Sequence, residues 1–210
     1  MTILWWVFSE FDEIFNMIAP ALLGVFPFTI LFLVTSITTL RERTGGTLER
    51  LMATPIGKLD VILGYAIAFS LFGILQSVIT SVYAILVLGL EVPGSLWFVI
   101  FVAVLDTLLG VALGLMVSAF ATTEFQAVQF MPLLIFPQIL VCGLLVPLSQ
   151  LPDVLEHIAY YLPLTYAVDA LNLATEQSEI TAEMWRDVWV VGAFIVGALG
   201  LASLTLRRRS

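Results

Sequence analysis

Few residues in this chain carry side chains that could do chemistry, and they stand far apart. The sequence has one histidine, His157, and one cysteine, Cys142. A single cysteine excludes an intrachain disulfide and a thiolate cluster, and a single histidine among apolar and tyrosine residues is typical of a structural position. The sequence also lacks a Gly-x-x-x-x-Gly-Lys-Ser/Thr phosphate loop and a His-Glu-x-x-His zinc pair. It therefore predicts a chain that is not an enzyme, holds no metal and binds no ATP itself.

Asp106 is a stronger functional candidate, because it is the only charged residue between positions 92 and 123, in an otherwise apolar stretch. A carboxyl group inside a membrane is costly and often functional, for example as a proton or cation site. Hydrogen bonds to neighbouring hydroxyl groups, or a wet crevice, would also satisfy it. No basic partner occurs in any apolar stretch, which favours the structural interpretation.

Long apolar stretches must position these residues. The chain of 210 residues is 60% hydrophobic and 11% charged, whereas a soluble domain carries about 25% charged residues. A helix needs about 20 apolar residues to cross a bilayer, and the apolar runs do not alternate with polar residues as barrel strands do. The sequence thus predicts a single all-α transmembrane domain with five spans, at residues 17–40, 61–89, 96–120, 126–147 and 188–206.

The basic residues predict the orientation of these spans. If consecutive spans alternate sides, segments 41–60, 121–125 and 207–210 share one side and contain seven of the eight basic residues. By the positive-inside rule this side is cytoplasmic. The outer side then holds residues 1–16, 90–95 and 148–187, which carry most of the acidic residues. We expect a multi-pass protein of the cytoplasmic membrane, surrounded by lipid, with its N-terminus outside and its C-terminus inside. A net charge of −8 does not favour nucleic-acid binding.

Two outer segments have further features. Residues 1–16 contain Trp5, Trp6 and Phe8, which suit a segment lying at the level of the lipid headgroups. Residues 148–187 are interrupted by prolines and contain two apolar stretches that are too short to span. Short, proline-broken apolar helices are typical of re-entrant or interfacial segments.

Residues 41–60, hereafter the polar island, separate the first two spans. Gly45 and Gly46 should end the first helix, and Thr47 is a good N-cap for a second, short one. Its first turn contains an acid, its apolar residues share one face, and Thr54-Pro55 ends it. The residues concerned are Leu48, Glu49, Leu51 and Met52. A two-turn helix is unstable alone, so we expect it to pack either on headgroups and its own spans or in a groove of a cytoplasmic partner.

Two stretches carry a family resemblance. "RERTGGTLERLMATPI" (41–56) resembles the coupling-helix region of membrane subunits of type-2 ATP-binding-cassette (ABC) exporters. "FPQILVCGLLVPLSQLPDVLEHIAYYLPLTYAVDAL" (136–171) resembles the fifth span and outer re-entrant helices of the same family, including daunorubicin-type multidrug-efflux permeases. The resemblance covers residues 17–206. Family subunits have six spans, so the five spans here correspond to a six-span bundle that lacks the first.

The resemblance implies a permease subunit that moves an amphipathic drug or lipid-like substrate outward. ATP and Mg²⁺ would be bound by a separate ABC ATP-binding subunit, and a second permease subunit would complete a homodimer. The implied ATPase-coupling residues are Arg43, Thr47, Leu48, Glu49, Arg50, Leu51 and Met52. The implied outer gate contains Pro163, Tyr166 and Asp169.

Polar and aromatic residues within the spans suggest a substrate pathway. The candidates are Phe28, Phe32, Asp106, Phe136 and Gln138. Gly110 and Gly114 form a Gly-x-x-x-Gly pair, which permits close contact between helices.

Two other functional classes stay open. One is an ion-coupled secondary transporter or channel that uses Asp106. The other is a membrane assembly protein that transports nothing.

Overall fold

The structure is a computed structural model of the chain. It describes residues 2–46, 50, 53, 55 and 57–205, and of residues 2–13 only the backbone. Within this part of the chain every regular element is a helix. The elements are α1 (Thr2–Thr44), α3 (Lys58–Leu86), α4 (Leu96–Ser118), α5 (Glu124–Val141), the 3₁₀ helix η1 (Leu148–Gln150), α6 (Asp153–Ala159), α7 (Pro163–Glu176) and α8 (Ala182–Thr205).

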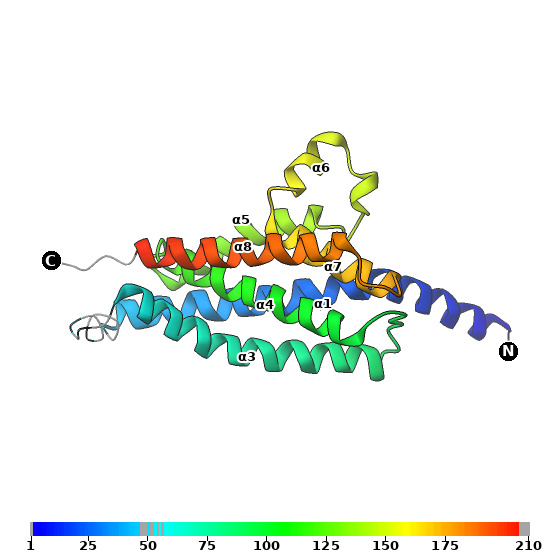
Figure 1. Cartoon of the computed structure of the whole chain (residues 1–210), viewed down its shortest axis with the longest axis horizontal. Coiled ribbons are helices and arrows are strands. Elements are labelled where there is room, and N and C mark those ends of the chain that lie inside the picture. Colours follow the sequence, from blue (N-terminus) through cyan, green and yellow to red (C-terminus); the bar gives the residue numbers. More distant parts are fainter. Residues whose placement is uncertain (1, 47–49, 51–52, 54, 56, 206–210) are drawn as a thin grey trace.

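Five helices are long and apolar enough to cross a membrane, and they run side by side along the long axis of the molecule (Figure 1). They are Ile14–Thr44 of α1, together with α3, α4, α5 and α8. The predicted all-helical fold with five spans is confirmed in this respect. The apolar runs predict it well because a helix satisfies every backbone group without water.

The helix ends differ from the predicted bounds. Residues 1–16 and the first span were expected as separate segments, but α1 is one helix of 43 residues. No proline or glycine occurs before Pro20 to interrupt it. Helix α5 ends at Val141 rather than near 147, and Gly143 follows with φ +96°. Helix α8 begins at Ala182 rather than at 188, because charged residues continue a helix that a hydropathy pattern cuts short.

Helix α4 occupies the centre of the bundle and contacts α1, α3, α7 and α8. Its approach to α1 depends on glycine. A Cβ atom at Gly114 would lie 2.7 Å from the carbonyl oxygen of Phe32, and one at Gly110 would overlap the carbonyl oxygen of Phe28. The Gly-x-x-x-Gly pair therefore does permit the close helix contact that the sequence predicts.

The segment between α5 and α8 forms two unlike helices. Helix α7 packs against α1, α4 and α8 and buries much of its surface. Helix α6 packs against α5 and projects from the side of the bundle with η1 (Figure 1). Pro152 precedes α6 and Pro163 opens α7, where the missing N–H of proline costs nothing. The prolines thus start these short helices, as well as separating them.

Candidate functional site

Helix α1 extends into the polar island and ends within it. The helix stops at Thr44, and Gly46 adopts φ +78°, a conformation that favours glycine. The prediction that the glycine pair ends the first helix is confirmed. Beyond it, the backbone N–H of Arg50 donates to the carbonyl of Gly46 at 3.2 Å. Most of the expected coupling helix, namely Thr47, Leu48, Glu49, Leu51 and Met52, lies outside the described residues.

Arg43 was predicted as an ATPase-coupling residue, and the structure places it within the bundle. Its half-buried guanidinium donates to the carbonyl of Ala119 at 2.7 Å and to that of Ala121. These carbonyls lie at the end of α4 and in the turn towards α5. The last carbonyls of a helix have no partner within the helix, so Arg43 supplies a cap from another element.

The two residues before Arg43 also reach other helices, which the sequence did not predict. Arg41 donates to both carboxylate oxygens of Glu124 on α5, at 2.8 and 2.7 Å. Glu42 accepts a hydrogen bond from the hydroxyl of Tyr65 on α3. The only signal in the sequence was the run of alternating charge at the end of a span. Glu124 itself stands in the short segment 121–125 between two predicted spans, where a charged residue is expected to face solvent.

An apolar hollow of about 460 Å³ lies between α1, α4, α5 and α8. Two of the predicted pathway residues, Phe32 and Gln138, line it, together with Pro163 from the start of α7. The amide of Gln138 donates to the carbonyl of Leu134 at 2.9 Å and accepts from the backbone N–H of Leu164 at 3.3 Å. Gln138 therefore fixes the start of α7 at one end of the hollow. The rest of the lining is apolar, so the hollow suits an apolar group.

The other predicted pathway residues do not lie in this hollow. Phe28 is fully buried, and Phe136 is 49% exposed. Asp106 is fully buried, and neither of its carboxylate oxygens has a hydrogen-bond partner in the part of the chain that the structure describes. A Cβ atom at Gly24 of α1 would lie 3.1 Å from Asp106 Oδ2. The carboxyl group thus packs closely against Gly24, and a side chain there would require the carboxyl group to shift by a few tenths of an ångström.

The three residues of the predicted outer gate lie together on α7. The hydroxyl of Tyr166 donates to the carbonyl of Tyr160 at 2.7 Å, which links α7 to the end of α6. Asp169 lies 3.9 Å from the guanidinium of Arg186, which also pairs with buried Asp187 at 2.9 Å. Burial raises the pKa of the Asp169 carboxyl above its usual value, and the charge of Arg186 opposes this. Arg186 and Asp187 were not predicted as site residues.

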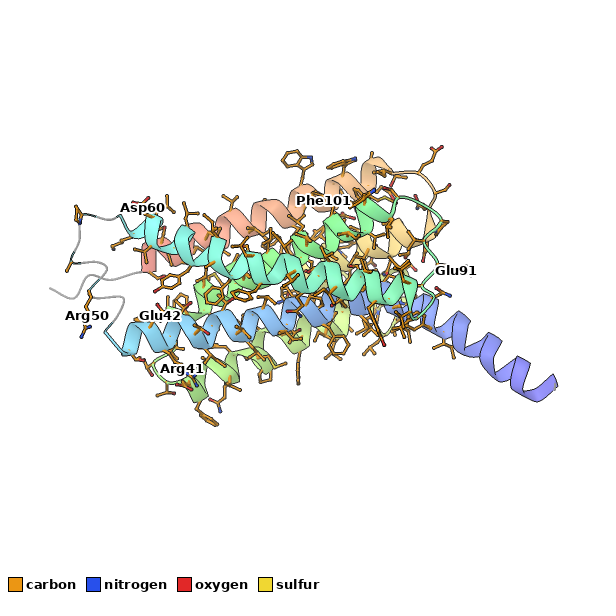
Figure 2. The ribbon with its side chains drawn as sticks, turned by 90° about the horizontal axis from the view of Figure 1, so that it is seen from below. Arg41, Glu42, Arg50, Asp60, Glu91 and Phe101 are labelled. Carbon is orange, nitrogen blue, oxygen red and sulfur yellow. The ribbon has the colours of Figure 1, made fainter. Side chains whose placement is uncertain are left out.

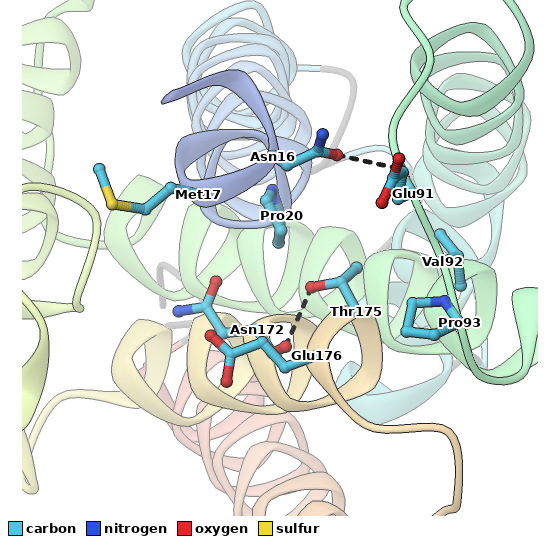
Figure 3. Close-up of a pocket in the computed structure, with 9 residues that line it drawn as sticks. All are labelled: Asn16, Met17, Pro20, Glu91, Val92, Pro93, Asn172, Thr175 and Glu176. Atoms are coloured by element: carbon cyan, nitrogen blue, oxygen red, sulfur yellow. Dashed lines mark hydrogen bonds between the residues drawn. The ribbon is translucent and has the colours of Figure 1, made fainter. Parts of the chain in front are cut away.

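A second, polar hollow of about 550 Å³ lies beside the C-terminal end of α7 (Figure 3). It is lined from α1, the α3–α4 loop and α7, and its polar residues include Asn16, Glu91, Asn172 and Glu176. The side chain of Asn16 accepts a hydrogen bond from the backbone N–H of Glu91 at 2.9 Å, which joins the loop to α1 (Figure 3). Among the residues that the structure describes, no three His, Cys, Asp or Glu side chains come close enough to hold a metal ion.

Comparison with known proteins adds to this geometry. A model of the family described as ABC-2 type transporter matches residues 1–174. The chain is 26% identical over 195 residues to YbhS of Escherichia coli K12, a probable multidrug ABC transporter permease, covering 92% of this chain and 52% of YbhS. The corresponding values for YbhR of the same strain are 24% over 192 residues, 91% and 52%. LnrN of Bacillus subtilis, a linearmycin resistance permease protein, is 27% identical over 184 residues, covering 85% of this chain and 44% of LnrN. The chain spans about half the length of the first curated relatives that it matches.

Proposed function

Because the chain belongs to the ABC-2 type transporter family, we propose that it is the transmembrane permease part of an ATP-driven exporter. The observation that carries this proposal is the family match over residues 1–174, which includes four of the five candidate spans and the polar island. Its five spans would be five of a six-span bundle. The polar island would lie in the cytoplasm, and α6 and α7 would be outer helices, with α7 re-entrant.

In this proposal a separate subunit binds ATP and Mg²⁺ and hydrolyses the nucleotide. It docks on a coupling helix formed by residues 47–53 of the polar island. A second copy of the permease completes a two-fold assembly, so that two ATP-binding subunits face each other. Their closure on ATP displaces the coupling helices and changes which side of the membrane the pathway opens to.

The proposed substrate is an amphipathic drug or a lipid-like molecule. The apolar hollow supports this class, because its lining is apolar apart from Gln138. Apolar pockets with one or a few polar groups bind molecules of mixed character and use the polar group to orient them. The names of YbhS and LnrN refer to multidrug transport and to linearmycin resistance, which supports a drug as the cargo.

Co-purification tests the coupling surface. The permease is co-expressed with a candidate ABC ATP-binding subunit from the same genome, and the complex is isolated in detergent. Leu51→Asp places a charge on the apolar face of the coupling helix, so we expect the ATP-binding subunit to be lost while the permease stays in the membrane. Leu88→Asp is the control, because it makes the same substitution at an exposed leucine that follows the opposite end of α3 from the polar island.

Two outcomes would contradict the proposal. One is that no ATP-binding subunit co-purifies with the unaltered chain. The other is that Leu51→Asp retains as much of this subunit as Leu88→Asp does, which would remove the coupling assignment from the 47–53 helix.

A further inference from the structure

Three consecutive residues at the end of α1 form contacts with three different parts of the bundle. Arg41 binds Glu124 on α5, Glu42 binds Tyr65 on α3, and Arg43 binds the carbonyls of Ala119 and Ala121 after α4. Successive side chains of an α-helix point about 100° apart, so three in a row cover most of its circumference. Arg41 and Glu42 lie at one end of the bundle, beside the polar island (Figure 2). Arg41, Glu42 and Arg43 are called the charged triplet below.

The three contacts differ in strength. The side chains of Arg41 and Glu124 are 65% and 52% exposed, respectively. Solvent therefore weakens the ion pair between them. Its two parallel hydrogen bonds nevertheless restrict the geometry of the contact between α1 and α5. The Arg43 contacts are half-buried and place a positive charge at the C-terminal end of α4, where the helix dipole favours it.

The triplet forms the first part of the polar island, in the last turn of α1. Helix α1 ends at Thr44 and α3 begins at Lys58, so the island connects these two helices. Tyr65 is two turns into α3, so its bond to Glu42 joins the helix before the island to the helix after it. Any displacement of the island therefore acts first on two helices that are tied together.

We infer that the charged triplet consists of positioning residues that make α1, α3, α4 and α5 move as one body when the polar island is displaced. This inference rests on the proposed function. Without the triplet, a force on the island would bend the ends of α1 and α3, and less of it would reach the adjacent ends of α4 and α5. With it, the same force reaches the walls of the apolar hollow, which α1, α4 and α5 share.

The experiment follows the far end of α5 and needs no substrate. Cys142 is replaced by serine, and a cysteine is placed at Leu145, which is 65% exposed and follows α5. The complex with the ATP-binding subunit is reconstituted in lipid nanodiscs. The rate of maleimide labelling at position 145 is then measured without nucleotide and with ATP plus vanadate. The melting temperature of each complex is recorded in parallel.

Charge exchange separates coupling from simple stabilisation. We expect Arg41→Glu to reduce the ATP-dependent change in labelling rate by about two- to fivefold, the range that the strength of an exposed ion pair allows. Adding Glu124→Arg should restore the change, because the pair is re-formed with opposite charges. Tyr65→Phe, which removes only the hydroxyl group, should reduce it as well. Lys58→Glu is the matched control, since it makes the same charge change at the same end of the bundle.

The outcomes are distinct for the two proposals. Loss of the ATP-binding subunit from the unaltered chain contradicts the proposed function. If the subunit is bound, the inference is overturned when position 145 does not respond to ATP. It is also overturned when Arg41→Glu responds as Lys58→Glu does, or when the double exchange fails to restore the response at an unchanged melting temperature. If Arg41→Glu lowers the yield of complex, Arg41→Gln is measured in the same way with the same expectation.

Discussion

At the scale of single residues, Asp106 distinguishes the two transport hypotheses. Its carboxyl group is buried between helices, and within the described residues neither oxygen has a partner. An ionised carboxylate in such a place is costly, so function as an ion site would require water or a cation to reach it. A role in packing would require only the shape of the group.

Asp106→Asn keeps this shape and removes the ability to ionise. For an ATP-driven permease we expect the variant to fold, to bind the ATP-binding subunit and to retain its ATP-dependent transport of a fluorescent amphipathic dye in proteoliposomes. Asp106→Leu is the comparison, because it also removes polarity. Loss of transport in Asp106→Asn with normal assembly would favour the ion-coupled alternative instead.

At the scale of elements, the contact between α1 and α4 is fixed by two glycines. A side chain at Gly114 would meet the backbone of Phe32, which cannot move aside as a flexible side chain can. We expect Gly114→Val to destabilise the protein by about 1–3 kcal/mol, the usual cost of overpacking a close contact. Thermal unfolding in detergent measures this.

Gly200→Val provides the control for this prediction. A Cβ atom at Gly200 meets nothing within 4 Å, and the residue lies on α8, another spanning helix. The substitution should leave the melting temperature nearly unchanged. Equal losses in the two variants would mean that valine disturbs any of these helices and that the α1–α4 contact has no special role.

The sequence predicts these elements better than it predicts their packing. Long apolar runs identify all five spans, because the hydropathy of a stretch is a sum over its own residues and needs no knowledge of which helices pack against it. Charged residues such as Glu183 and Asp187 made α8 look shorter than it is, since a helix does not stop where its apolar part does. Neither the central place of α4 nor the partner of Arg43 could be predicted, because neighbours in a bundle depend on side-chain shape across helices. Gly110 and Gly114 were the one indication of a close contact.

At the scale of the whole molecule, the orientation in the membrane is a testable prediction. The distribution of basic residues places the polar island in the cytoplasm and the loop after α6 outside. Tyr161, 80% exposed in that loop, and Lys58, at the island, give two reporter positions. In a Cys142→Ser background, Tyr161→Cys should react with a membrane-impermeant maleimide in intact cells, whereas Lys58→Cys should react only after the cells are opened. The reverse pattern would invert the topology and place the proposed coupling helix outside.

The length of α1 has a consequence of its own. At 1.5 Å per residue, its 43 residues extend over about 65 Å, whereas the hydrocarbon layer is about 30 Å thick. To remain inside that layer the helix would have to tilt by about 60°, beyond the range of up to about 40° found for membrane helices. Part of α1 must therefore stand clear of the acyl chains. Residues 2–13 of α1 precede the candidate span Ile14–Thr44, so a probe tethered to them would report on the membrane surface and not on the interior of the bundle.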